Sequence, residues 1–176
     1  MRVIGAPARR GLLGPLAEPL HLLDARVVRS ALTGQANALL VGPHLEVDDV
    51  RVVALTEGEG RERRVCQIVD LRAPGTAFTA ANLHASIARD HARAELGLLE
   101  RRLAGTGAVV VCGDFNVPGL GLPGFSSPLR GIDQILVRGL ALLGPAESWP
   151  EARRRYGAVV LSDHAPVDAV VGLPAA

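Results

Sequence analysis

An expected helix that leads directly into an expected buried strand places the tightest limit on the fold of this chain. Residues 88–104 carry Leu96, Leu99 and Leu103 at helical spacing, and Arg and Glu fill the other face, which predicts an amphipathic helix. Two glycines then end the helix. The strand predicted at 108–112 reads AVVVC, and such an uninterrupted apolar run is typical of a strand buried on both faces. We expect the helix on the outside and this strand inside.

Short runs of β-forming residues, separated by turn residues, make up most of the remaining chain. Strands are predicted at 25–31, 37–41, 50–56, 64–71, 77–83, 132–138, 140–148 and 165–172. The pattern also predicts a hairpin turn at 57–62, a loop rich in Gly, Pro and Ser at 117–131, and a polar loop or short helix at 150–155. A strand-dominated chain with one clear helix belongs to the α+β class.

Length and charge bound the domain organisation. The 176 residues fit one domain, 1–176, in which we expect residues 1–24 to be irregular, with room for one short helix, and 25–172 to form the core. Hydrophobic residues make up 48% and charged residues 21%, which excludes a disordered chain. The net charge of +1 argues against a globally basic nucleic-acid binder and leaves room for a local basic patch.

The two cysteines, Cys66 and Cys112, each lie in an apolar run and are too few for a disulfide framework. We expect both to be buried, reduced thiols, which fits a cytoplasmic location. No apolar stretch reaches the ~18–20 residues that span a bilayer. Pro and charged residues interrupt the apolar residues of the N-terminus, which makes it a poor signal peptide.

Chemically reactive side chains stand at the ends of several expected strands. They are three carboxylates, two amides and two imidazoles: Asp114, Asp133, Asp163, Asn82, Asn116, His84 and His164. Mg²⁺ prefers carboxylate and amide oxygens, and a bound Mg²⁺ stabilises charge on a phosphoryl group. An Asp beside a His orients the imidazole and raises its basicity, while Asn donors suit phosphoryl oxygens or an attacking water.

These residues belong to four ordered motifs: Asn82-Leu83-His84, Val111-Cys112-Gly113-Asp114-Phe115-Asn116, Gly131-Ile132-Asp133-Gln134-Ile135-Leu136 and Ser162-Asp163-His164. They resemble the N-T-H-L, G-D-F-N, I-D-[YH]-I-[FL] and S-D-H motifs of the endonuclease/exonuclease/phosphatase superfamily, the DNase I-like proteins. Asn37-Ala38-Leu39-Leu40 is also similar to a strand common in bacterial members. The resemblance covers roughly residues 34–172. It implies a DNase I-like four-layer α/β/β/α sandwich of two mixed sheets and a divalent-metal-dependent phosphoesterase.

The resemblance also implies roles for the first half of the site. Asp114 would activate or position the attacking water near the metal. Asn116 would orient that water and contact the phosphoryl oxygens, and His84 would stabilise charge on the phosphoryl group. The implied reaction is in-line hydrolysis of a phosphoester.

The second half of the site is implied by the same resemblance. His164 would lie against the scissile phosphate, and Asp133 would hold its imidazole. Asp163 would bind the metal, Mg²⁺ or Mn²⁺, directly or through water, together with Asp114. Nucleic acid, a phospholipid and an inositol phosphate all remain open as substrates, because each is hydrolysed by members of the superfamily.

The sequence departs from the family pattern at its start. Members begin with a strand that ends in Asn and a second strand that ends in Gln-Glu, whose Glu is the main metal ligand, and nothing before Ala25 matches these. Glu18 does not end an apolar strand. We therefore expect an N-terminally incomplete sandwich that binds Mg²⁺ weakly, hydrolyses phosphodiesters poorly or not at all, and tends to self-associate. Leu83 replaces the usual Thr, and Gln134 replaces an aromatic residue or His, which puts a substrate contact in doubt.

Simpler interpretations of the same residues stay open. Asp114 and Asn116 are common turn residues after a strand, His84 can be a core histidine, and Asp163 can serve a turn. The run at 153–155 is typical of a solvated loop, and His21, His44 and His91 are expected at the surface.

Three functions follow from these interpretations: an active Mg²⁺-dependent phosphoesterase, a non-catalytic family member without the metal-binding Glu, and a nucleic-acid-binding module. The near-zero net charge and the few aromatic residues count against the third.

Overall fold

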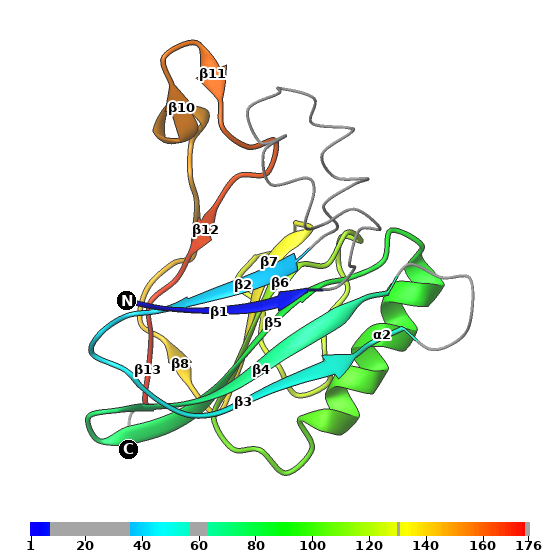
Figure 1. Ribbon diagram of the computed structural model, residues 1–176, viewed down its shortest axis with the longest axis vertical. Helices are drawn as coiled ribbons and strands as arrows, with labels where there is room; N and C mark the ends of the chain where they lie inside the picture. The colour runs from blue at the N-terminus through cyan, green and yellow to red at the C-terminus, as the bar shows by residue number, and fades with distance from the viewer. Residues whose placement is uncertain (8–35, 57–62, 130, 175–176) are drawn as a thin grey trace, which may run out of the picture.

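The structure, a computed structural model, describes residues 1–7, 36–56, 63–129 and 131–174. Its main element is a five-stranded sheet with the order β3–β4–β5–β6–β7 (Figure 1). These strands span Glu46–Ala54, Val65–Ala73, Thr76–His84, Val109–Asp114 and Asp133–Arg138. Neighbouring strands are antiparallel except β5 and β6, which helix α2, Arg89–Arg102, connects in parallel.

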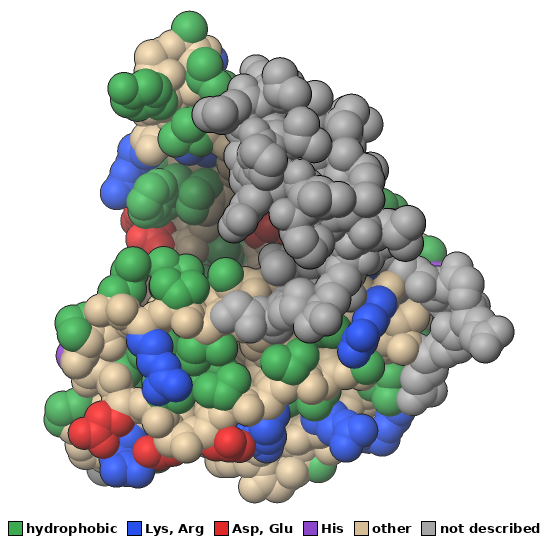
Figure 2. Space-filling view, viewed as in Figure 1, with side chains coloured by type: hydrophobic (Ala, Val, Ile, Leu, Met, Phe, Trp, Pro, Cys, Tyr) green, Lys and Arg blue, Asp and Glu red, His purple; other side chains and the backbone are tan. Residues whose placement is uncertain are grey.

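The start of β3 extends beyond the predicted strand, which began at residue 50. Its first residues are charged and exposed, so the apolar pattern did not reveal them. Ion pairs to β4 accompany this part, with Arg51 Nη2 lying 2.6 Å from Asp70 Oδ2 and Arg72 Nη2 lying 2.6 Å from Asp48 Oδ1. Acidic and basic side chains accordingly lie next to one another along the lower edge of the molecule, over β3 and β4 (Figure 2).

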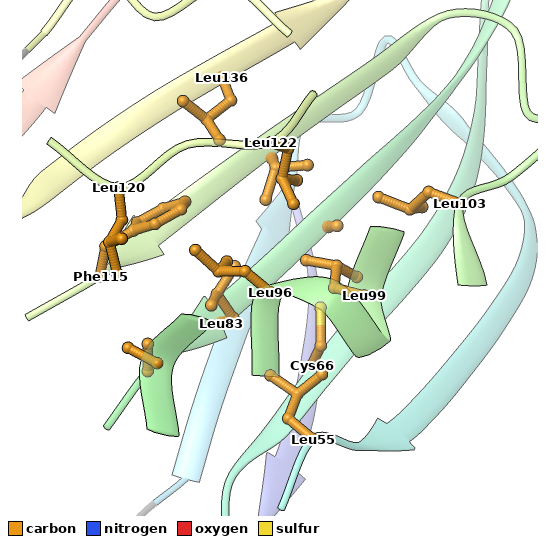
Figure 3. Close-up of a cluster of buried hydrophobic side chains, with 14 of the residues drawn as sticks. Leu55, Cys66, Leu83, Leu96, Leu99, Leu103, Phe115, Leu120, Leu122 and Leu136 are labelled. Carbon is orange, nitrogen blue, oxygen red and sulfur yellow. The ribbon is translucent and has the colours of Figure 1, made fainter. Parts of the chain in front are cut away.

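Helix α2 covers one face of the sheet, as predicted, and closes the larger core over it (Figure 3). Leu96 and Leu99 of the helix are buried against Cys66, Leu83 and Leu136 of three strands. The sheet contributes alternate residues because successive side chains point to opposite faces. This core therefore fixes the faces of the strands that carry the reactive side chains.

One charged residue of α2 lies on the buried face, contrary to the expectation that Glu fills the outer one. Glu95 is only 3% exposed, together with Ala92 and Leu99. It occupies the inward stripe because it is three residues after Ala92 and four before Leu99.

Strand β6 is fully buried on the face that packs against α2 and only half-buried on its other face. Val109 and Val111 are inaccessible, whereas Val110 and Cys112 on the other face are half-buried. The prediction of burial on both faces is therefore wrong for the second face, because that face lines a cavity. Cys66 is buried as expected, and both cysteines are free thiols.

A second β layer packs on the face opposite α2. Strands β1, Arg2–Pro7, and β2, Ala36–Val41, form an antiparallel pair whose Ile4 and Val41 contact a second core on the sheet. The Gln67 side chain donates to the Ile4 carbonyl at 2.7 Å and ties the layers together. The expectation of an irregular start is wrong for β1, because pairing with β2 supplies order that its own sequence does not signal.

The C-terminal part consists of short antiparallel pairs. Strand β8, Ala141–Leu142, pairs with β13, Val171–Gly172. Strand β9, Glu147–Ser148, pairs with β12, Val167–Asp168. Strand β10, Arg155–Tyr156, pairs with β11, Val159–Val160. The prediction of single strands at 140–148 and 165–172 is therefore wrong. Gly144 and Pro145 separate β8 from β9 within the first range, because Pro has no N–H to donate to a strand ladder. The second range contains β12 and β13, which pair with β9 and β8 respectively.

The segment at 150–155 forms the 3₁₀ helix η3, Glu151–Arg154, which runs into β10 and the hairpin that projects at the top of Figure 1. The strand predicted at 25–31 and the turn predicted at 57–62 lie outside the described residues. Three layers of the predicted α/β/β/α sandwich are therefore present in the expected order: helix α2, the five-stranded sheet and the second β layer. Within the described residues, no α-helix covers the second β layer. None of the helices described there is long and apolar enough to cross a membrane.

Candidate active site

Three strand ends bring the first reactive residues together on the sheet. His84 ends β5 and is the register partner of Asp114 on β6, which in turn faces Asp133 at the start of β7. Alternation along β6 places Asp114 on the same face as Val110 and Cys112, opposite α2. The site therefore forms at one end of the sheet, on the side of the second β layer.

Gly113 allows β5 and β6 to approach closely at this point. Its φ is +143°, and a Cβ atom there would lie 1.9 Å from the Leu83 carbonyl oxygen. Only glycine fits such a position. The glycine of the motif therefore has a steric role next to Asp114.

The turn after β6 fixes Asp114 and Asn116 relative to each other. The Asn116 backbone N–H donates to Asp114 Oδ1 at 2.7 Å, and its side-chain Nδ2 donates to the Ala85 carbonyl at 2.8 Å. Phe115 between them is fully buried and anchors the turn in the core. Asn116 has φ +55°, a left-handed conformation that Asn tolerates better than most residues.

The turn contacts leave Asp114 Oδ2 directed at two imidazoles. It lies 3.4 Å from His84 Nε2 and 3.9 Å from His164 Nε2. The Asp114 side chain is 17% exposed, and the two histidine side chains are 37% and 38% exposed. Asp114 therefore serves the turn through one oxygen and faces the imidazoles with the other, and the site remains accessible to a small molecule.

The hydrogen bond expected between Asp133 and His164 is present. His164 Nδ1 lies 3.0 Å from both Asp133 carboxylate oxygens, and the Ser162 hydroxyl accepts the His164 backbone N–H at 3.1 Å. The hydrogen bond with Asp133 raises the pKa of His164; partial burial opposes this, and the charges of Asp133, Asp114 and Asp163 add to it. The geometry favours a proton on Nδ1 and leaves Nε2 directed at Asp114.

Two residues of the motifs lie outside this cluster. Asp163 is exposed and acts on His164 through its charge, and within the described residues it is not part of the cluster that Asp114 forms with Asp133 and His164. Gln134 is 1% exposed and accepts a hydrogen bond from the Ser127 hydroxyl, because it points to the opposite face of β7 from Asp133. The Gln134 side chain is therefore buried on the face opposite Asp133.

Several residues that support the site had no motif to mark them. Ser86 follows the His84 strand and bonds to the buried Glu95, while the guanidinium of Arg154 donates to the Ser162 carbonyl at 2.6 Å. Arg153 stacks on the Trp149 ring at 4.2 Å. Arg153 and Arg155 are exposed, as expected of a solvated run, while Arg154 is half-buried and bonds to the Ser162 carbonyl. The inward helical spacing of Glu95 was a signal available in the sequence.

A cavity of about 400 Å³ adjoins the cluster. Asp114, Asp133, Ser162 and His164 line its polar part. Val110 and Cys112 of β6 lie in its apolar part, which Val167 and Val171 of the C-terminal strands complete. The cavity gives the carboxylate and imidazole groups a common space that a small molecule can enter.

Oxygen and nitrogen atoms of Asp114, Asp133 and His164 lie within 4.8 Å of one another and form a candidate metal centre. Asp133 is engaged with His164, and Asp114 Oδ1 accepts a hydrogen bond from Asn116. The carboxylate oxygen that remains for a hard cation in the cluster is Asp114 Oδ2. Mg²⁺ sites in proteins often use one or two carboxylates and keep several waters, so the donor set fits a weakly held divalent cation.

No protein-family model and no curated protein matches this sequence. Solved structures do match its fold. A conserved protein of unknown function from Enterococcus faecalis V583 is 16% identical with a TM-score of 0.74, over 98% of this chain and 77% of that chain. An endonuclease/exonuclease/phosphatase from Bacteroides vulgatus is 17% identical with a TM-score of 0.70, over 98% and 76% of the two chains.

A mannosyl-6-phosphatase from Bacteroides thetaiotaomicron VPI-5482 is 14% identical with a TM-score of 0.65, over 98% of this chain and 77% of that chain. Together these likenesses confirm the predicted fold. The chain is an α+β protein with the DNase I-like architecture that its motifs indicated.

Proposed function

We propose that this chain, which has the fold of the endonuclease/exonuclease/phosphatase structures, is a divalent-metal-dependent phosphoesterase of that superfamily. The observation that carries the proposal is the position of Asp114 Oδ2, 3.4 Å from His84 Nε2 and 3.9 Å from His164 Nε2, with Asp133 behind the second imidazole. The mannosyl-6-phosphatase activity named for one structural neighbour supports a phosphoester as the bond attacked.

In the proposed reaction a water molecule attacks phosphorus while the bond from phosphorus to the leaving oxygen breaks. Asp114 orients this water and takes its proton. The leaving oxygen receives a proton from Nε2 of the His164 imidazolium. Since Asp133 raises the pKa of His164, a larger share of this imidazole carries the proton near neutral pH.

His84 and Asn116 stabilise the phosphoryl group in this proposal. Nδ2 of Asn116 uses one N–H for the Ala85 carbonyl and keeps a second donor for a phosphoryl oxygen. The His84 imidazole faces Oδ2 of Asp114, the oxygen that the Asn116 backbone does not occupy, and donates to the phosphoryl group. Fixed donors that face the developing charge lower the barrier because they need no reorganisation.

The proposed cation is Mg²⁺ or Mn²⁺. Asp114 Oδ2 would hold it directly and the exposed Asp163 through a bridging water, and it would neutralise charge on the phosphoryl oxygens. The free thiols of Cys66 and Cys112 are in keeping with a cytoplasmic location, which we include in the proposal.

A weakly active or non-catalytic family member is the second candidate. The observation in its favour is the donor set: within the described residues, the candidate metal cluster contains no glutamate. A cation held by few carboxylates exchanges readily and stabilises charge less. On this alternative the chain keeps the fold and the Asp133–His164 pair but hydrolyses little substrate.

Hydrolysis of bis-p-nitrophenyl phosphate and p-nitrophenyl phosphate, with and without Mg²⁺ or Mn²⁺, tests the proposal. We expect cation-dependent turnover, and we expect Asp114→Asn to reduce it by at least about 100-fold while the protein stays folded. Asp90→Asn is the matched control, because Asp90 lies on α2 with a side chain that is 91% exposed. Turnover that Asp114→Asn leaves unchanged would overturn the proposal, whereas a folded wild-type protein without turnover would establish the second candidate.

A further inference from the structure

The loop between β5 and α2 is held from inside the protein by a buried acid. Glu95 is 3% exposed on the inward face of α2. Its carboxylate accepts the Ser86 backbone N–H at 2.8 Å through Oε2 and the Ser86 hydroxyl at 2.5 Å through Oε1. A buried carboxylate is costly unless its oxygens are hydrogen-bonded, and Ser86 meets that need for both oxygens.

The same loop is held from the other side by the candidate active site. The Ala85 backbone N–H donates to the Asp114 carbonyl at 2.8 Å, and the Ala85 carbonyl accepts Nδ2 of Asn116 at 2.8 Å. His84 directly precedes Ala85. Two consecutive residues, Ala85 and Ser86, therefore connect the helix to the β6 turn, and His84 is attached to this connection.

This connection has few alternatives for fixing the loop. Ala85 is fully buried and Ser86 partly buried, whereas Ile87 is 76% exposed. The N-cap position of α2 has no side-chain hydrogen bond, so the start of the helix does not hold the loop through a cap. Glu95, about two turns further along the helix, holds the loop instead, through the Ser86 N–H and hydroxyl.

We propose that Glu95 is a positioning residue for the candidate active site. It acts through Ser86 and Ala85, setting where His84 and Asn116 lie relative to Asp114, and it does not touch the substrate. The expected effect of Glu95 on turnover rests on the proposed phosphoesterase function. Its effect on the geometry of the loop exists whether or not the chain is active.

Glu95→Gln tests the inference with little change of shape. A Gln side chain keeps one acceptor oxygen for the Ser86 N–H, and its NH₂ group donates to the Ser86 hydroxyl, so two hydrogen bonds to a carboxylate are replaced by two weaker neutral ones, one of them reversed. In heteronuclear NMR spectra of the full chain we expect shifts of the Asn116 side-chain amide, the Ala85 amide and the His84 imidazole. Glu100→Gln is the matched control, because Glu100 lies on the same helix outside this contact, and it should leave these signals unchanged.

Turnover provides the second arm. If the wild-type chain hydrolyses p-nitrophenyl phosphate or bis-p-nitrophenyl phosphate, we expect Glu95→Gln to lower kcat about 10- to 100-fold and to leave KM within about two-fold. The reason is that displacement of a catalytic group affects the chemical step. Ser86→Ala removes one of the same hydrogen bonds and serves where Glu95→Gln does not fold. The double variant should lose no more than the worse single variant, because both act through one connection.

The outcomes separate the inference from the proposed function. A folded but inactive wild-type chain overturns the phosphoesterase proposal, while the NMR shifts still decide the role of Glu95. Unchanged signals of Asn116, Ala85 and His84 in Glu95→Gln and Ser86→Ala, with a loss of thermal stability alone, would show that Glu95 is merely structural. An additive loss of kcat in the double variant would show that Glu95 does not act through Ser86.

Discussion

The central sheet and the C-terminal segment of residues 139–174 hold the candidate active site in different ways. Every residue from Val65 to Val69 is buried, whereas none of the residues in the C-terminal segment is buried. Yet His84, Asp114 and Asp133 come from the sheet, and Asp163 and His164 come from the segment. Half of the site therefore has the support of a packed core and half does not.

The C-terminal segment reaches the site through polar contacts. His164 bonds to Asp133, the Arg154 guanidinium donates to the Ser162 carbonyl, and the Trp149 backbone N–H donates to the Pro166 carbonyl. Hydrogen bonds at half-exposed positions contribute little to stability compared with buried apolar side chains. We infer that the position of His164 depends mainly on Asp133, while packing fixes the position of Asp114.

The largest effect is expected for Gly113→Ala in the sheet. A Cβ atom there would lie 1.9 Å from the Leu83 carbonyl oxygen, so strands β5 and β6 must separate. We expect a loss of at least about 4 kcal/mol of unfolding free energy in urea melts. Gly119→Ala is the control: its φ is +74° but no atom lies within 4 Å of the new Cβ, so strain alone should cost about 1–2 kcal/mol. Equal losses in the two variants would contradict the close approach.

Phe115→Ala should destabilise the chain by about 3–5 kcal/mol, because it removes a fully buried ring beneath the Asp114–Asn116 turn. The companion variant in the C-terminal segment is Leu161→Ala, whose side chain is 67% exposed and whose loss should cost less than about 0.5 kcal/mol. Chemical denaturation of both proteins measures the contrast. A loss of more than about 2 kcal/mol of unfolding free energy for Leu161→Ala would show that the segment is packed more firmly than its exposure indicates.

Amide hydrogen exchange compares the two regions without mutation. We expect amides in the short pairs β8–β13 and β9–β12 to exchange at least about 100-fold faster than those of β5 and β6, which corresponds to about 2.8 kcal/mol. The reason is that regions with few buried side chains open locally at low cost. Uniform protection across both regions would remove the distinction between them.

The smallest effect concerns the bond that joins the regions. Asp133→Asn should lower stability by about 1 kcal/mol or less, because the His164 side chain is 38% exposed and solvent screens the interaction. Asp133 raises the pKa of His164, so this stabilisation is complete below the ordinary value of 6.5 and is lost as pH rises through the raised value. Melts at several pH values should therefore show the wild-type advantage shrinking on the alkaline side. An advantage that grows with pH would have the wrong sign.

Much of the sheet was predictable from the sequence. The runs of β-forming residues in β4, β5 and β7 and the leucine spacing of α2 are local patterns that indicate strands and a buried helix face. Strand β1 carries no such pattern, and the short C-terminal pairs depend on partners far away in the chain. Pairing of this kind is decided by the tertiary context, so propensity does not reveal it.

The candidate site was predictable as residue types at strand ends, and its geometry was only partly so. The contact between Asp133 and His164 was implied by the resemblance of their two motifs to those of the superfamily, and the structure contains it. The burial of Gln134 and the inward position of Glu95 did not follow, because each depends on which face of an element meets the core. Asp163 was expected beside Asp114, and the structure places it at the surface.

Titration of the His164 imidazole by NMR, in the wild-type chain and in Asp133→Asn, tests most directly whether Asp133 holds the C-terminal half of the site. We expect the wild-type His164 to titrate above its ordinary value of 6.5 and the variant to titrate at a lower pH than the wild type. The backbone amide signals of α2, on the opposite face of the sheet, serve as the internal control and should be the same in both proteins. An identical His164 titration in the two proteins would show that Asp133 does not hold this imidazole, and the account of a site shared between a packed and a tethered region would be wrong.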